Sequence, residues 1–358
     1  MSDLPIVDGH LDLAENVTIF GRDLTRTAAE TRAIENRTSR QATVSLPDLE
    51  RGGVAVVCAT VTAGFLASDI AGVGDDFVPR SAIYRTQEEA EAQALSQIRL
   101  YESWQRQRRV RLLKSVTDLD HHLQLWQHDR KPGLVLLIEG ADPIVQVADL
   151  PKWWQLGLRM IGVTFGDTAY GRGVAGGSAE YNRGGFKPEG FALLDGMAEQ
   201  GFIWDISHLT EDGVWQGLDR GTPRVCASHA NARALVPTDR HLSDAVIRTI
   251  AERGGVIGLV LYNGFIEPRW RQDRLVAVTL RGHLRRHAEH MARVAGWEHI
   301  GIGSDLDGGL GLEESPIEID TVADLYKVEN AVPDQAKDAV LSTNWLNFLR
   351  SALPLTSE

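Results

Sequence analysis

Eight short apolar runs recur along the whole chain, and their alternation with helical or loop segments constrains the fold more than any other feature. The runs are rich in Val, Ile and Leu without strict polar alternation, as is typical of strands covered on both faces. Such a pattern predicts a parallel sheet with crossover helices. The predicted strands are Pro5–Leu11, Val54–Val61, Gly133–Ile138, Leu158–Thr164, Phe202–Ile206, Arg224–Ser228, Val256–Leu261 and Ile300–Ser304.

Amphipathic segments between these runs predict the crossover helices. We expect helices at Gln87–Arg109, Phe191–Gln200, Asp244–Arg253 and Leu284–Ala295. Ser243 is suited to cap the start of the third helix and Gly201 to end the second. Eight strand–helix units within 358 residues favour a closed (β/α)8 TIM barrel over an open sheet. No linker or repeat divides the sequence, so residues 1–358 are expected to form one barrel domain.

Composition and targeting signals narrow the class of protein. The formal net charge is −12, from 37 Lys and Arg against 49 Asp and Glu, which argues against nucleic acid as a partner. The sequence shows no signal peptide and no apolar run near the roughly 20 residues that span a bilayer, so no membrane partner is expected. Cys58 and Cys226 lie in apolar runs and are interpreted as buried free thiols. A cytoplasmic location follows as the default.

Polar residues suited to metal binding follow five of the predicted strands, at the end where a barrel carries its active site. The first strand ends in Asp8-Gly9-His10-Leu11-Asp12, and residues two apart on a strand point the same way, so His10 and Asp12 can share an ion. The remaining candidates are Glu139 after the third strand, His208 and His229 after the fifth and sixth, and Asp305 after the eighth. Each alone has a structural alternative, a helix cap or a core histidine, but their coincidence at one rim indicates a metal site.

Ligands of this kind favour zinc chemistry. Two divalent ions need about five ligands and a shared water, and a bridging carboxylate lets both ions act on that water. The pKa of such a water falls to about 7, which makes hydroxide available as a nucleophile. A nearby carboxylate can take up the proton and deliver it to a leaving amine, and Asp305 is the candidate for this catalytic role.

These residues, together with Ala232-Arg233, Tyr262-Asn263, Gly301–Gly308 and the closing Asn344-Trp345-Leu346, resemble the motifs of the renal (membrane) dipeptidase family, peptidase family M19, within the amidohydrolase superfamily. The motifs occur in the family's order and cover nearly the whole chain. The resemblance implies a binuclear metallo-dipeptidase that hydrolyses the amide bond of small dipeptides, with a bridging hydroxide as nucleophile and two zinc ions as cofactors. It also implies that the chain can form a homodimer.

The resemblance further implies a role for each matching residue. It makes His10 and Asp12 ligands of one zinc, His208 and His229 ligands of the other, Glu139 the bridge between them, and Asp305 the general base and acid. It makes Arg240, Tyr262 and Asn263 substrate-binding residues, with Arg240 holding the substrate's C-terminal carboxylate. A guanidinium group can pair with both carboxylate oxygens. The alternative for Arg240 is a surface arginine.

Two departures from the family concern the substrate pocket. Where the family has a histidine that contacts the scissile carbonyl oxygen, this chain has Phe165, which cannot donate a hydrogen bond, so the metal alone or a donor from 167–170 would have to replace it. Loss of an oxyanion donor costs about 10²–10³ in rate where a site depends on it. The second strand also ends in Cys58-Ala59-Thr60-Val61-Thr62, without the family's aromatic residues.

These departures leave three hypotheses open. The first is the zinc dipeptidase, and the second is a binuclear amidohydrolase that acts on another small amide, such as an N-acyl amino acid, or on a cyclic amide or lactone. The third is a non-catalytic protein on an enzyme scaffold.

Two further patterns are set aside as structural. Gly171-Arg-Gly-Val-Ala-Gly176 matches the dinucleotide-binding GxGxxG pattern, but it does not open into a helix. His283, His287 and His290 lack the HExxH order of metalloprotease helices, and they are predicted to lie on a solvated helix face. The same interpretation is given to His121, His122 and His128.

Overall fold

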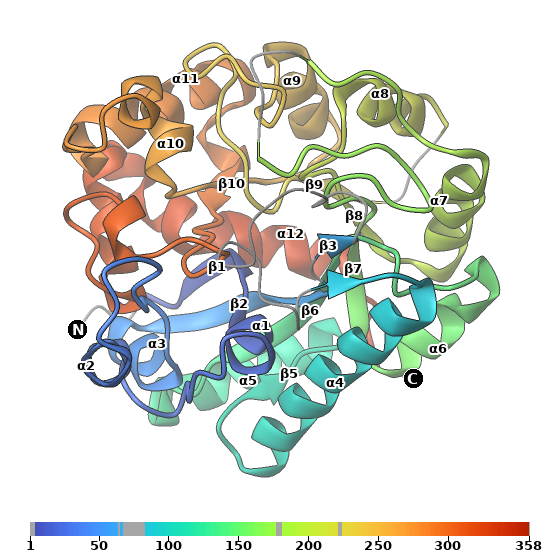
Figure 1. Cartoon of the computed structure of the whole chain (residues 1–358), viewed down its shortest axis with the longest axis horizontal. Coiled ribbons are helices and arrows are strands. Elements are labelled where there is room, and N and C mark those ends of the chain that lie inside the picture. The colour runs from blue at the N-terminus through green and yellow to red at the C-terminus, as the bar shows by residue number, and fades with distance from the viewer. Residues whose placement is uncertain (1–3, 64, 67–82, 177–180, 221–223, 358) are drawn as a thin grey trace.

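Eight parallel strands form the predicted (β/α)8 barrel (Figure 1). The structure is a computed structural model that describes residues 4–63, 65–66, 83–176, 181–220 and 224–357. The barrel strands run in the order β10-β11-β1-β2-β6-β7-β8-β9, and a parallel bridge between Ala227 and Ile257 joins the two ends of this path. They are β1 Ile6–Leu11, β2 Val54–Thr62, β6 Gly133–Glu139, β7 Leu158–Gly162, β8 Ile203–Asp205, β9 Val225–Cys226, β10 Ile257–Leu259 and β11 Ile300–Ile302.

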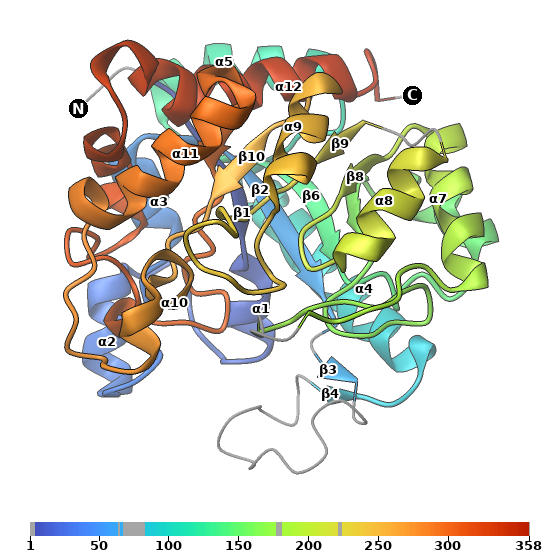
Figure 2. The same cartoon turned by 90° about the horizontal axis from the view of Figure 1, so that it is seen from above.

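The helices surround the barrel and cover its outer face (Figures 1 and 2). They are α1 Leu13–Thr18, α2 Ala28–Glu35, α3 Leu46–Gly52, α4 Gln87–Arg106, α5 Val116–Asp129, α6 Leu150–Gln155, α7 Pro188–Gln200, α8 Glu211–Asp219, α9 Asp244–Glu252, α10 Asn263–Ile266, α11 Arg285–Ala295 and α12 Asn344–Ala352. The predicted helix caps are confirmed, because Ser243 accepts a hydrogen bond from the Val246 amide and Gly201 ends α7 with a φ of 90°.

Three short strands were not predicted. β3 Phe65–Leu66 pairs with β4 Ile83–Tyr84, and β5 Arg111–Leu112 adds to the first residues of β6. Each of them has two residues, which is too short to give a periodic pattern in the sequence.

Helix α12 ties the last barrel strand to the first. The ring of Trp345 lies over Gly9 of β1 and Gly301 of β11, where an added Cβ would come within 2.3 Å of the ring in both cases. The indole N–H donates to the Ile302 carbonyl at 2.8 Å. The side-chain amide of Asn344 donates to the Ile300 carbonyl at 2.7 Å. The closing Asn-Trp-Leu motif is therefore a structural element of the barrel.

The buried side chains confirm one interpretation and correct another. Cys58 and Cys226 are buried free thiols, as predicted. The solvated helix face predicted for the histidines is wrong for His287, which is buried, accepts from the Ala232 amide and donates to the Ile266 carbonyl. It is also wrong for His122, which is buried and donates to the Ala55 carbonyl at 2.8 Å. Tertiary packing buried these rings although charged residues flank them in sequence.

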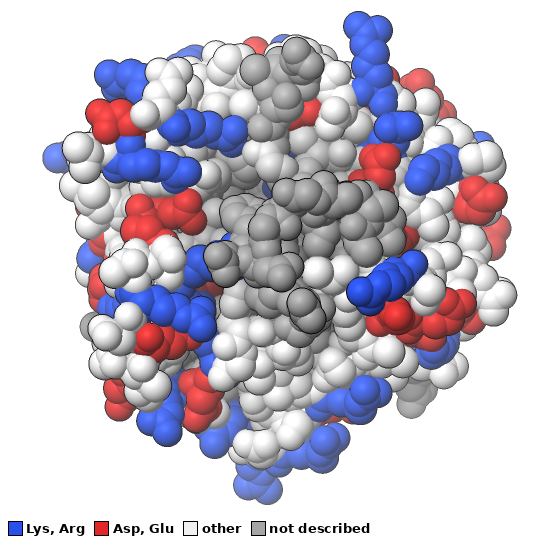
Figure 3. All heavy atoms as spheres, in the orientation of Figure 1, with Lys and Arg blue, Asp and Glu red and all other residues white. Residues whose placement is uncertain are grey.

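All carboxyl ends of the barrel strands open on one mouth, toward the bottom of Figure 2, and Figure 1 looks onto it. On this face the described cationic and anionic side chains are interspersed, without a broad surface of one sign (Figure 3). Among the described residues, no helix combines the length and apolar character needed to cross a bilayer.

Candidate metal centre

The mouth of the barrel gathers the predicted metal ligands and the predicted base. His10 lies in β1 and Glu139 is the last residue of β6, while the others follow their strands within three residues. Because the strands are parallel, these positions meet at the same rim. The structure thus brings together the six residues that the sequence named: His10, Asp12, Glu139, His208, His229 and Asp305.

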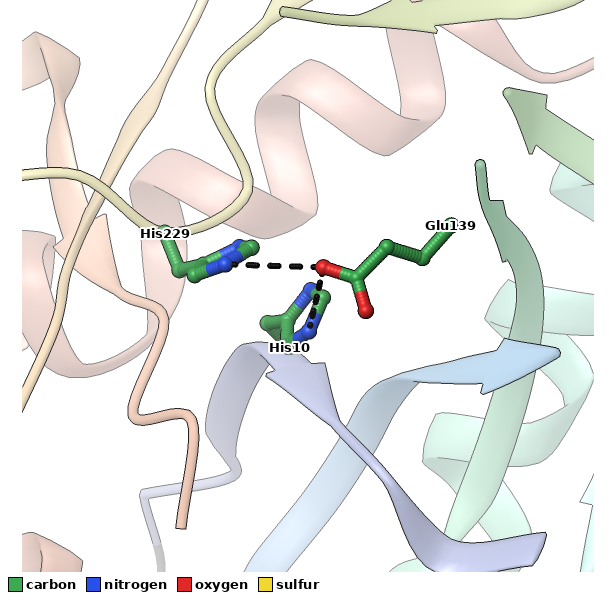
Figure 4. A group of neighbouring side chains, drawn as sticks. All are labelled: His10, Glu139 and His229. Atoms are coloured by element: carbon green, nitrogen blue, oxygen red, sulfur yellow. Dashed lines mark ion pairs between the residues drawn. The ribbon is translucent and has the colours of Figure 1, made fainter. Parts of the chain in front are cut away.

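The carboxylate of Glu139 is the centre of this group. Its Oε1 atom lies 3.5 Å from Nε2 of His10 and 3.6 Å from Nε2 of His229, and Figure 4 shows both rings and the carboxylate pointing toward one another. Nε2 of His208 is 3.1 Å from the same oxygen. One oxygen therefore faces three imidazoles that come from β1 and from the loops after β8 and β9.

Two aspartates complete the other side of the group. Nε2 of His10 lies 3.8 Å from Oδ2 of Asp12 and 4.0 Å from Oδ1 of Asp305. The hydroxyl of Thr60, on β2, donates to the other oxygen of Asp12 and holds that carboxylate in place. His10, Asp12 and Asp305 form one group whose ligand atoms lie within 4.8 Å of one another, and His10, Glu139 and His229 form a second such group.

The tautomers of the histidines show what the centre can bind. Nδ1 of His208 lies 2.8 Å from the carbonyl oxygen of Val174, which can only accept, so the ring proton is on Nδ1 and Nε2 carries a lone pair. That lone pair faces Nε2 of His229 at 2.9 Å. Nε2 of His10 is buried and has no hydrogen-bond partner among the described residues. Imidazole Nε2 atoms that converge on a carboxylate in this way are suited to bind a cation.

The charges of the centre lead to the same conclusion. Burial raises the pKa of Asp12 and of Asp305 well above its usual range, and the nearby Glu139 carboxylate raises both further. Burial also raises the pKa of Glu139 itself, and it lowers the pKa of His10 to about 4. Without an ion the centre combines crowded carboxylates with neutral imidazoles. Divalent cations would relieve this repulsion, so the residues present fit metal ions.

The backbone adopts an uncommon conformation to place two of these side chains. His208 and Asp305 have φ values of 64° and 59°, in the left-handed region that side chains with a Cβ rarely occupy. Gly308 packs its backbone against the aspartates, because a Cβ there would lie 1.9 Å from Oδ1 of Asp305 and 2.7 Å from Oδ2 of Asp12. This close approach requires glycine at position 308.

A cavity of about 330 Å³ opens beside the centre. Asp12, Glu139, His208 and Asp305 lie in its wall, and so does Tyr262, one of the predicted substrate-binding residues. Asn263, the residue after Tyr262, does not belong to the wall. Its side-chain amide donates to the Ser315 carbonyl at 2.9 Å instead.

Arg240 is buried rather than on the surface, and it lies behind His208. Its Nη2 atom donates to Nε2 of His208 at 3.1 Å and to the His229 carbonyl at 3.0 Å. A guanidinium group is therefore held next to two of the predicted ligands. The surface alternative for Arg240 is wrong.

Phe165 occupies the cavity wall as the sequence comparison anticipated. Its ring meets the His208 ring edge to face, with centroids 4.9 Å apart. The segment 167–170 does not belong to the wall of this cavity; Thr168 donates to the Val163 carbonyl at 3.1 Å and Tyr170 donates to the Ile144 carbonyl. This part of the wall is apolar.

Three polar residues of the centre were not predicted from the sequence. Glu15, in the first turn of α1, lies in the cavity wall, and its position three residues after Asp12 was a usable signal. Asp205 and Ser228 lie beneath the histidines, where Ser228 donates to Asp205 at 2.5 Å. Asp205 lies three residues before His208 and Ser228 directly before His229, but neither residue carried an assigned role.

The fold and the site together define the class of protein. It is a TIM-barrel protein with a candidate metal centre at the mouth of the barrel, where this fold usually carries its active site. Within this class, residues 1–351 match the model of the family described as membrane dipeptidase (peptidase family M19). The chain belongs to this family, which is a family of metallopeptidases.

Individual relatives agree with this assignment. The chain is 31% identical over 254 residues to an uncharacterized protein in the pqqA 5' region of Klebsiella pneumoniae, covering 68% of this chain and 89% of that protein. It is 27% identical over 244 residues to the uncharacterized dipeptidase C965.12 of Schizosaccharomyces pombe, covering 66% of this chain and 56% of that protein. A Rhodobacter sphaeroides metallopeptidase, crystallised with a phosphinate mimic of the dipeptide L-Ala-D-Ala, has the same fold, with a TM-score of 0.78 at 22% identity over 98% of this chain and 99% of that one.

Proposed function

We propose that this chain is a zinc-dependent hydrolase that cleaves the amide bond of small dipeptides. The observation that carries the proposal is the convergence of three imidazole Nε2 atoms on one oxygen of Glu139, at 3.1–3.6 Å. The cavity beside it, at about 330 Å³, lies at the small end of the roughly 300–1,000 Å³ range of ligand pockets, which suits a small substrate.

The residues divide into two overlapping ligand sets. His10 and Asp12 with Glu139 would hold one ion, and His208 and His229 with Glu139 would hold the other. Bound there, divalent ions supply a Lewis acid for a carbonyl oxygen and lower the pKa of water.

Asp305 is the proposed proton carrier. Its carboxylate is in the cavity wall, next to the ligand group but supplied by a different strand. In the proposed reaction it takes up the proton of the attacking water and delivers it to the amine nitrogen that leaves. The backbone of Gly308 packs against this carboxylate and holds its orientation.

Arg240 is the proposed anchor for the substrate's C-terminal carboxylate. Nε2 of His208 has one lone pair, which now accepts a hydrogen bond from Arg240. A metal ligand at this nitrogen cannot keep that bond, so metal loading would leave the Arg240 N–H available to another acceptor. A carboxylate that can pair with the guanidinium fork fits this requirement. Tyr262, in the cavity wall, is proposed to contact the substrate, and Asn263 to support that role by fixing the segment through its bond to the Ser315 carbonyl.

The test combines metal analysis with a substrate panel. The purified protein would be stripped with a chelator, reloaded with zinc, and assayed on dipeptides with L- and D-residues at the C-terminal position. L-Ala-D-Ala is a suitable member, because a phosphinate mimic of it binds the Rhodobacter relative. We expect zinc-dependent release of free amino acids and inhibition by the phosphinate. Absence of turnover on every dipeptide by fully zinc-loaded protein would contradict the proposal.

A second candidate function rests on the apolar wall at Phe165. Without a donor for the scissile carbonyl, the pocket would favour a substrate with an apolar acyl group, such as an N-acyl amino acid. Hydrolysis of N-acyl amino acids with no dipeptide turnover would select this function. A chain that retains zinc but cleaves neither class would favour a non-catalytic role.

A further inference from the structure

One buried hydroxyl contacts two of the proposed ligands. Oγ of Ser228 lies 3.1 Å from Nδ1 of His10 and 2.8 Å from Nδ1 of His229. The two imidazoles come from different strands, and their ring centroids are 3.7 Å apart. Ser228 itself has no accessible surface. Each histidine belongs to a different ligand set of the proposed two-metal centre.

The proton of this hydroxyl has a defined destination. Oδ2 of Asp205 lies 2.5 Å from Oγ of Ser228, and a carboxylate can only accept, so Ser228 donates to Asp205. Asp205 is fixed in turn by the backbone amides of Ser207 and Ser228, at 3.0 and 2.8 Å. The hydroxyl of Ser207 lies 3.2 Å from Oγ of Ser228, which is the longest of the four side-chain contacts of Ser228. The Ser207 hydroxyl also accepts from the His229 amide.

This arrangement favours one tautomer for both rings. A hydroxyl that donates its single proton keeps two lone pairs, and the two nearest ring nitrogens, Nδ1 of His229 at 2.8 Å and Nδ1 of His10 at 3.1 Å, can use them as N–H donors. With the proton on Nδ1, His10 and His229 both direct an unprotonated Nε2 toward Glu139. The same bonds fix the planes of both rings.

We propose that Ser228, held by Asp205, is a positioning residue shared by the two metal sites, so that loss of its hydroxyl weakens both sites together. Partners of metal-bound histidines commonly orient a single ligand. Here one hydroxyl orients a ligand in each site. The inference deepens the two-metal function proposed above and rests on it.

The first test reads the tautomers in metal-free protein. The chain has 11 histidines, and selective ¹⁵N labelling of histidine separates Nδ1–H from Nε2–H rings by their nitrogen shifts. His10→Gln and His229→Gln, each removing one signal, provide the assignments. We expect both rings as Nδ1–H tautomers in the wild-type protein, and a mixture of tautomers in Ser228→Ala. An Nε2–H tautomer at either position in the wild type would overturn the proposal without any need for the Ser228 variant to fold.

The second test measures zinc affinity by calorimetric titration of stripped protein. Ser228→Ala should weaken both zinc sites by about 10–100-fold. Ser304→Ala is the matched control, because the buried Ser304 hydroxyl also donates to a buried carboxylate, that of Asp8, at 2.5 Å. None of the described bonds of Ser304 reaches an imidazole, so the control should retain both affinities.

The outcomes separate this inference from the proposed function. If the wild type binds two zinc ions and Ser228→Ala loses affinity at one site only, or at neither, the shared role is wrong and the two-metal function stands. If the wild type itself does not bind two zinc ions, the proposed function fails first. Equal losses in Ser228→Ala and Ser304→Ala would show a general packing effect and would overturn the shared role.

Discussion

Removal of metal should make the stability of this protein fall as the pH rises, and Glu15 should account for a measurable part of the loss. Burial raises the pKa of Glu15 from 4.5 to about 8, and the Glu139 carboxylate raises it further while Arg40 opposes the rise. Because its pKa is higher in the folded state, the folded protein keeps a proton that the unfolded chain releases. The stabilisation is complete below pH 4.5 and is lost as the pH approaches 8.

The size of the effect follows from this difference in pKa. At pH 7 the medium is about 2.5 pH units above the ordinary pKa of the carboxyl, and each unit is worth about 1.4 kcal/mol, which gives about 3.5 kcal/mol. Glu15 also lines an open cavity, where solvent screens its charge, so about 1–3 kcal/mol is expected. Glu15→Gln removes the titrating group and should return this amount to the metal-free protein at neutral pH.

The free energy of unfolding of the metal-free protein can be measured by urea unfolding in the presence of a chelator, with the fluorescence of the nine tryptophans as the signal. Wild type and Glu15→Gln would be compared at about pH 5 and about pH 8, and the free energies of unfolding should diverge at the higher pH. Glu199→Gln, at an exposed position on α7, is the control and should follow the wild type. Parallel pH profiles for wild type and Glu15→Gln would refute the reasoning.

Three further predictions concern the loaded enzyme. Asp305→Asn should keep zinc but lower kcat by about 10²–10⁴, and unchanged turnover in a zinc-replete sample would exclude Asp305 as the proton carrier. Phe165→His adds a hydrogen-bond donor to the cavity wall and should raise kcat/KM on dipeptides by about 10–10². An unchanged kcat/KM at equal zinc content would show that the rate is not limited by the lack of a donor to the scissile carbonyl at this position. Gly308→Ala should lose zinc, measured by metal analysis, because its Cβ would meet the Asp305 carboxylate at 1.9 Å. Gly176→Ala, in the same cavity wall, should keep zinc, because no atom of the described residues lies within 4 Å of the added Cβ.

The barrel was predictable because its strands are buried on both faces and leave continuous apolar runs. The ends of the strands were less predictable. The run Phe202–Ile206 was expected to be a strand, but β8 ends at Asp205, and the backbone then turns to place His208 at a φ of 64°. The run Ile300–Ser304 likewise exceeds β11, which ends at Ile302 before the turn at Asp305. The hydrogen-bonded strand therefore ends early where the backbone must turn to direct a side chain, His208 or Asp305, into the mouth of the barrel.

The candidate ligands were predictable because histidine and carboxylate are unusual directly after an apolar strand. The supporting residues were not, since a buried serine such as Ser228 has no distinguishing pattern in one sequence. Its importance depends on which rings lie within 3.1 Å of it, and that is a property of the fold. The burial of His287 has the same origin, because α11 packs that ring against residues distant in sequence.

The position of β1 in the barrel has a consequence for biosynthesis. This strand comes before the other barrel strands in the sequence and pairs with both β2 and β11, so one of its edges stays unpaired until a partner nearly three hundred residues later has been synthesised. His10 is synthesised early but cannot contact Asp305 until Asp305 has been made. Trp345, which packs over Gly9 of β1 and Gly301 of β11, is synthesised later still. The candidate metal centre can therefore be completed only after Asp305 has been synthesised, late in translation.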